Sequence, residues 1–171
     1  MNSGIFWGIF TVIGAATGAT IAIHTARHVQ AKQHAFEEAR RLSQGKGIVN
    51  IGAGPHRTFG AQVIAEQPEV LANIDITPNG IPHFIQLDIE RELLPFIYKQ
   101  FGCAFASHIL EHLDNWQFAL EEACRVADNV VVVLPHPCSF GGWLNPEHRQ
   151  HFSPADIDNM LTLHPNVIVY Y

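Results

Sequence analysis

Short apolar runs in this 171-residue chain end in glycine, acidic or hydroxyl residues, which are residue types that can bind a nucleoside-like ligand. The residues concerned are Gly52, Gly54, Asp75, Asp88 and Ser107, together with nearby Asn50, Ile76 and Ile89. Two glycines in a tight turn let a ligand approach the backbone closely. A carboxylate at the end of a neighbouring strand can bind ribose hydroxyl groups, and the spacing from Gly54 to Asp75 suits that arrangement.

Histidines are the candidates for proton transfer, because imidazole titrates near neutral pH. The chain has eleven histidines, and four of them lie where a site is expected: His108, His112, His148 and His151. We favour His108 and His112 as catalytic residues. A structural or surface position is the alternative for each of the four.

The sequence does not predict a metal site. His148 and His151 are three residues apart, which could place both on one helical turn, but no third ligand is evident beside them. Cys103, Cys124 and Cys138 lack the spacing of a zinc site or of a disulfide framework. We therefore expect reduced thiols.

Alternating strands and helices must position these residues. The apolar runs predict strands at 47–51, 71–76, 83–87, 103–107, 129–134 and 166–171. Helical patterns occur at 58–66, 90–100, 115–127 and 154–163, with Pro95 interrupting the second. Strands that are apolar on both faces and alternate with helices imply a mostly parallel sheet covered by helices, so the fold class is α/β. Ligands of such sheets bind beyond the carboxyl ends of the strands.

The N-terminal segment is expected to cross a membrane. Residues 5–23 carry neither charge nor proline, and a helix of that length, at about 1.5 Å per residue, nearly matches a hydrocarbon core about 30 Å thick. Residues 1–26 are thus predicted to form a single transmembrane helix, residues 27–46 a juxtamembrane amphipathic helix and residues 47–171 the globular domain. A buried core helix and a cleaved signal peptide are the alternatives.

The charge distribution indicates orientation and partners. Basic residues follow the predicted span, which places the C-terminal domain in the cytoplasm by the positive-inside rule. Gly14 and Gly18 would let a partner helix or a second copy pack closely within the bilayer. The formal net charge is −6, and residues 47–171 carry five basic against fourteen acidic residues. Nucleic-acid binding is not expected, because a basic surface is needed to neutralise phosphates.

Six segments, in order along residues 47–171, resemble the class I S-adenosylmethionine-dependent methyltransferases, in particular the small-molecule type. They are VNIGAGP, NIDI, LDIERELLPF, FASHILEHLDNW, NVVVVLP and PEHRQHFSPADIDNML. The resemblance implies a Rossmann-like fold and S-adenosylmethionine as cofactor. It implies that Gly52 and Gly54 lie under the methionine part of the cofactor and that Asp75 accepts both ribose hydroxyls. The remaining implied contacts are to the adenine, from Asp88 and Ile89, and near the methyl group, from Ser107 and His108.

Some residues depart from the family pattern. Family members usually carry Asp or Glu where Asn50 stands, and a third glycine is common where His56 stands. The seventh, antiparallel strand of the family is missing, so a C-terminally shortened sheet is expected. Nicotinamide dinucleotides are disfavoured as ligands, because Arg57 occupies the place of the third glycine of their motif.

Three functions remain open. The preferred one is a membrane-anchored methyltransferase that acts on a small acceptor. An acceptor taken from the bilayer would be lipophilic. The second is a catalytically inactive methyltransferase-like subunit with a structural or assembly role in a membrane complex. The third is a histidine-based metal protein.

Overall fold

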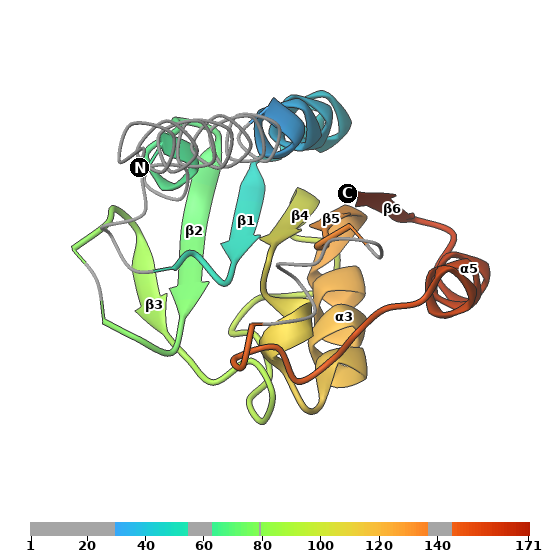
Figure 1. The fold of residues 1–171 in the computed structure, drawn as a ribbon. Helices are drawn as coiled ribbons and strands as arrows, with labels where there is room; N and C mark the ends of the chain where they lie inside the picture. Colours follow the sequence, from blue (N-terminus) through green and yellow to red (C-terminus); the bar gives the residue numbers. More distant parts are fainter. Residues whose placement is uncertain (1–29, 55–62, 79, 137–144) are drawn as a thin grey trace, which may run out of the picture.

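A computed structural model describes residues 30–54, 63–78, 80–136 and 145–171 (Figure 1). The predicted membrane span, the Gly14 and Gly18 pair, His56, Arg57 and Cys138 lie outside these ranges. Within them, no helix combines the length and the apolar character that crossing a bilayer requires.

The core of the fold is a six-stranded sheet in the order β3-β2-β1-β4-β5-β6, in which each neighbouring pair is parallel. The strands are β1 (Ile48–Ile51), β2 (Val70–Asp75), β3 (Phe84–Gln86), β4 (Phe101–Ser107), β5 (Ala127–Val133) and β6 (Val167–Tyr170). The chain runs outward from β1 to β3, returns to β4 beside β1, and then runs outward again to β6. The strand order therefore reverses between β1 and β4, which is where ligands of open parallel sheets bind.

Parallel connections place helices on both faces of the sheet, so its central strands are buried on both sides, as the apolar runs predict. Every residue of β1 and β4 is buried. Alternate residues of β4 face different sides: Ala104 and Ala106 pack in one apolar cluster, and Cys103 and Phe105 pack in another. Burial raises the pKa of the Cys103 thiol to about 12, so this cysteine is an unreactive core residue.

Helices cover the two faces (Figure 1). Helical residues 30–43 contribute Ala35, Phe36 and Ala39 to the cluster that contains Phe105. On the other face lies α3 (Trp116–Val126), with a buried stripe that includes Ala119, Leu120 and Ala123. The first helix ends against β4 so closely that a Cβ at Gly102 would lie 1.9 Å from the carbonyl oxygen of Ser43.

The last helix, α5 (Pro154–Leu163), coincides with the predicted range 154–163. Its start is set by a capping box, in which the Ser153 and Asp156 side chains each accept a hydrogen bond from the other's backbone N–H. Pro154 occupies the first turn, where its missing N–H is not needed.

The prediction of a helix at 90–100 is wrong, because that segment is an irregular loop of turns. Pro95 cannot donate a helical hydrogen bond, and α3 supplies the loop with partners instead. Arg125 donates to the carbonyl oxygens of Leu94 and Phe96, at 2.9 and 2.8 Å. Glu122, with a side chain 8% exposed, accepts from the Leu94 N–H at 2.8 Å and pairs with the Arg125 guanidinium at 2.7 Å.

We predict that this network makes stability depend on pH. The hydrogen bonds from Arg125 and Leu94 hold the pKa of Glu122 below its ordinary value, against the opposing effect of burial. Its contribution is therefore present above the unfolded pKa of about 4.3 and is lost as pH falls through the lower folded pKa. Glu122→Gln should lower the free energy of unfolding at pH 7 by about 1.5–3 kcal/mol and should flatten its acid dependence, both measured by urea denaturation. Exposed Glu121→Gln on the same helix is the control. Parallel acid profiles for wild type and Glu122→Gln would contradict the prediction.

Candidate functional site

The glycine turn and Asp75 meet at the carboxyl end of the sheet. The backbone N–H groups of Gly52 and Ala53 donate to the carbonyl oxygen of Ile74, at 2.9 and 3.0 Å. The Gly54 N–H then donates to Asp75 Oδ2 at 2.8 Å. The turn after β1 is thus folded over the end of β2, and the two features that the sequence places 21 residues apart lie in direct contact.

The Asp75 carboxylate has a fixed orientation. Its second oxygen, Oδ1, accepts from the Thr77 N–H at 2.8 Å. An ionised carboxylate offers about four acceptor positions, so two backbone donors leave capacity for further hydrogen bonds. Beside it, the apolar Ile76 side chain is 60% exposed. A polar acceptor and an apolar surface are therefore adjacent, as a nucleoside requires.

Gly52 joins this turn to the end of β4, a contact that the sequence does not predict. Its φ of 68° lies in the left-handed region, which favours glycine. A Cβ at this position would lie 2.5 Å from Cγ1 of Ile109, which follows β4 by two residues. Any larger residue would push Ile109 away, so packing between the two loops, as well as φ, requires glycine here.

The last residue of β4 is incompletely hydrogen-bonded, and the residue after it is strained. The Oγ atom of buried Ser107 has no hydrogen-bond partner among the described residues. His108 has a φ of 53°, an uncommon conformation that costs about 1–3 kcal/mol and that tends to persist at functional sites. Its Nδ1 lies 3.1 Å from Oε1 of Glu111, which lies in the short helix η1 (Leu110–His112).

Asp88 and Ile89 do not face one common ligand surface: Asp88 bonds within its own turn, and Ile89 packs in the core. Asp88 Oδ1 accepts from the Glu90 N–H at 3.0 Å, and the Asp88 backbone N–H donates to Glu92 Oε1 at 3.0 Å. Ile89 is buried in the main apolar cluster. Asp88 thus stabilises its own turn after β3, on the same edge of the sheet as Asp75.

Asn50 has a structural partner that the sequence does not reveal. It is buried in β1, and its Nδ2 donates to Oδ1 of Asn73 in β2 at 2.8 Å. Asn73 Nδ2 donates in turn to the carbonyl oxygens of Ala65 and Pro82, at 3.0 and 2.8 Å. Because these carbonyls fix which way the Asn73 amide points, Asn50 must act as a donor toward it.

His112 and Glu111 lie in η1, beyond Ser107. His112 Nδ1 is 3.0 Å from the backbone carbonyl oxygen of Glu147, which joins η1 to the segment that carries His148. His151 is exposed.

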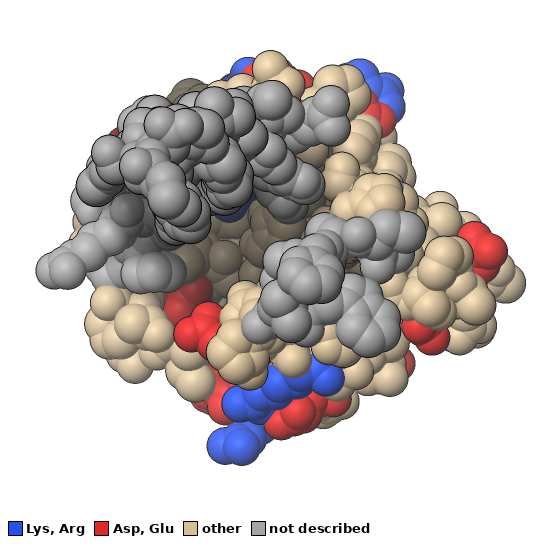
Figure 2. Space-filling model, in the orientation of Figure 1, with Lys and Arg blue, Asp and Glu red and all other residues tan. Residues whose placement is uncertain are grey.

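Acidic side chains gather at the lower edge of the hollow in Figure 2, above a group of basic side chains. A separate cavity of about 430 Å³ lies between residues 30–40 and 63–67 and contains none of the predicted site residues.

Replacing Asn50 with aspartate tests its donor role. Asn50→Asp removes the N–H that donates to Asn73 Oδ1 and sets two acceptors against each other in a buried position. We expect the free energy of unfolding to fall by about 1–3 kcal/mol at pH 7, measured by urea denaturation. Asn159→Asp, on the exposed side of α5, is the matched control and should be near neutral. Equal stabilities of Asn50→Asp and wild type would show that the hydrogen bond is not formed.

Comparison with known proteins gives one family match. Residues 49–130 match the family model described as a methyltransferase domain. A search of curated proteins finds no match. The matched segment begins in β1 and ends in β5, so it contains the glycine turn, Asp75 and the end of β4. Members of this family typically bind S-adenosylmethionine. The segment from β1 to β5 thus matches a methyltransferase domain of the class I, S-adenosylmethionine-dependent type, and it lies in a parallel-sheet α/β fold.

Proposed function

We propose that this chain is an S-adenosylmethionine-dependent methyltransferase. The observation that carries the proposal is the hydrogen bond from the Gly54 N–H to Asp75 Oδ2. It brings a close-approach turn and a carboxylate together at the edge where the strand order reverses. The methyltransferase family match covers both features.

The residues present fit this cofactor. Asp75 has acceptor capacity left for ribose hydroxyls after binding the Gly54 and Thr77 N–H groups. The exposed Ile76 side chain can cover an adenine ring. The buried Ser107 Oγ, which has no hydrogen-bond partner in the described part of the chain, can bond a polar group of the cofactor or the acceptor. When bound, S-adenosylmethionine supplies a methyl group activated by a positively charged sulfur.

His108 is oriented to act as a base for an acceptor hydroxyl. Its Nδ1 faces Glu111 Oε1 at 3.1 Å, so a proton on Nδ1 is stabilised by the carboxylate and Nε2 becomes the basic nitrogen. Methyl transfer depends chiefly on holding the acceptor atom in line with the methyl group. The strained backbone at His108 fixes the position of this imidazole relative to the end of β4.

A second function, a catalytically inactive subunit with a structural role in a membrane complex, is favoured by Asn50. At this position a carboxylate would attract the positive charges of the cofactor, and here a neutral amide is committed to Asn73. Turnover by the purified chain with any acceptor would exclude this alternative.

We propose further that residues 5–23 anchor the chain in a membrane, with the C-terminal domain in the cytoplasm. The support comes from the uncharged segment and the basic residues that follow it. Gly14 and Gly18 are the proposed contact with a partner helix or a second copy. A methyltransferase held at the bilayer would reach small lipophilic acceptors most readily.

Two arginines in the proposed span test the anchor. The double variant Ala15→Arg, Ala16→Arg should release the full-length chain from membranes at alkaline pH, because each charge at the centre of a span costs about 2.5–3.5 kcal/mol. The wild type and the control Gln30→Arg, beyond the span, should stay in the membrane pellet. Release of the wild type under the same conditions would refute the anchor.

Removing the charge of Asp75 tests cofactor binding. The full-length chain in mild detergent is titrated calorimetrically with S-adenosylhomocysteine, the demethylated product. We expect Asp75→Asn to bind at least about tenfold more weakly than wild type, or about 1.4 kcal/mol, while exposed Asp158→Asn binds like wild type. Circular dichroism is the control that should show each variant to be folded. Absence of binding to the folded wild type at millimolar ligand would overturn the proposed function.

A further inference from the structure

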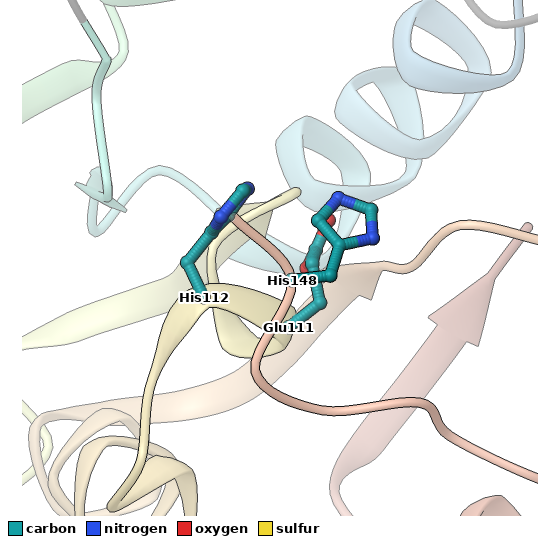
Figure 3. A group of neighbouring side chains, drawn as sticks. All are labelled: Glu111, His112 and His148. Carbon is teal, nitrogen blue, oxygen red and sulfur yellow. The ribbon is translucent and has the colours of Figure 1, made fainter. Parts of the chain in front are cut away.

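Three potential metal ligands lie together beyond the end of β4: Glu111 and His112 from η1, and His148 from the segment before α5 (Figure 3). One ligand atom from each residue lies within 4.8 Å of the other two. The ring centroids of the two histidines are 4.9 Å apart. The spacing in the sequence suggests His148 and His151 as joint metal ligands. In the structure, His148 lies instead beside Glu111 and His112, which come about 36 positions earlier in the chain.

Glu111 has a buried oxygen that needs a partner. Its side chain is 1% exposed, and its Oε1 lies 3.1 Å from His108 Nδ1. Its Oε2 is buried and has no hydrogen-bond partner among the described residues. A buried carboxylate oxygen without a partner is costly, and a bound cation would compensate for the lost hydration. A carboxylate whose other oxygen is already hydrogen-bonded is also typical of a metal ligand.

His112 is held in the state that metal binding requires. Its Nδ1 lies 3.0 Å from the backbone carbonyl oxygen of Glu147. A carbonyl only accepts, so Nδ1 must carry the proton, and the lone pair of the neutral ring is on Nε2. Histidines that bind metals usually donate their other ring N–H to a carbonyl or carboxylate in this way.

The segment that carries His148 is fixed against Glu111 by the backbone. The N–H groups of Arg149 and Gln150 both donate to the carbonyl oxygen of Glu111, at 2.7 and 3.0 Å. The Arg149 side chain also forms an ion pair with Asp114, just beyond η1. The three ligands are thus brought together by contacts that do not involve a metal, so the site is preformed.

We propose that Glu111, His112 and His148 bind one divalent transition-metal ion of the Zn²⁺ class. Two imidazole nitrogens and one carboxylate oxygen are ligands that suit Zn²⁺, whereas Mg²⁺ and Ca²⁺ prefer oxygen ligands alone. Three protein ligands leave the fourth tetrahedral position open to water, as in catalytic zinc sites. The proposal stands on these contacts and does not depend on the proposed methyltransferase function.

Calorimetric titration with ZnCl₂ tests this site. The full-length chain is stripped with a chelator, dialysed and titrated in mild detergent. We expect one equivalent of Zn²⁺ to bind to wild type, and MgCl₂ at the same concentrations to give no binding. His148→Ala should weaken Zn²⁺ binding at least about tenfold, as should Glu111→Gln. His151→Ala, which removes an exposed histidine three residues away, should bind within about twofold of wild type.

A thermal readout separates a metal ligand from a merely structural residue. Zn²⁺ should raise the unfolding temperature of wild type and of His151→Ala but not that of His148→Ala, because a ligand that binds only the folded state stabilises it. If Glu111→Gln does not fold, the half-buried His148→Ala decides the outcome. Failure of wild type to bind Zn²⁺, or wild-type binding and stabilisation in His148→Ala, would overturn the proposal.

Discussion

The hydrogen bond between the Gly54 N–H and Asp75 Oδ2 is the contact on which the rest of the site depends. It ties the loop after β1 to the end of β2, and Gly52 in the same loop packs directly against Ile109 beyond β4. Three strand ends are therefore joined by two close contacts at the point where the sheet order reverses. A longer side chain at position 52, or the loss of the Asp75 carboxylate, would move these strand ends apart. The surfaces proposed to hold the cofactor would then also separate.

Buried polar groups are paired within the fold at several places and are incompletely paired at the end of β4. Asn50 and Asn73 bond one another, and Glu122 bonds both Arg125 and the Leu94 N–H, so each of these groups is paired within the fold. At the end of β4, by contrast, Ser107 Oγ and Glu111 Oε2 are buried without a partner among the described residues. Two further unpaired buried atoms of the described residues, Arg40 Nε and Glu69 Oε2, belong to an ion pair beside the start of β2. A folded chain retains unpaired buried polar atoms at a cost in stability, so the two that lie where the strand order reverses point to a ligand there.

Much of the fold could be predicted from the sequence, because continuous apolar runs such as that of β4 indicate strands buried on both faces. The meeting of the glycine turn with Asp75 was predictable for the same reason, since parallel strands end at one edge. The roles of Asn73, Ile109 and Glu111 were not, because each depends on a partner in another segment. Glutamate in particular is usually a surface residue, yet Glu111 is buried. The N–H groups of residues 149–150, from a segment far along the chain, bond its carbonyl oxygen. The 90–100 loop was mistaken for a helix because the Arg125 hydrogen bonds that sustain it come from α3.

An amide NMR spectrum of the full-length, ¹⁵N-labelled chain with and without S-adenosylhomocysteine tests the cofactor site most directly. If the two loops form the cofactor site, the largest shifts will fall on the amides of Gly52, Gly54 and Thr77 and on those directly after β4. Shifts confined to the cavity between residues 30–40 and 63–67, with these amides unmoved, would contradict it.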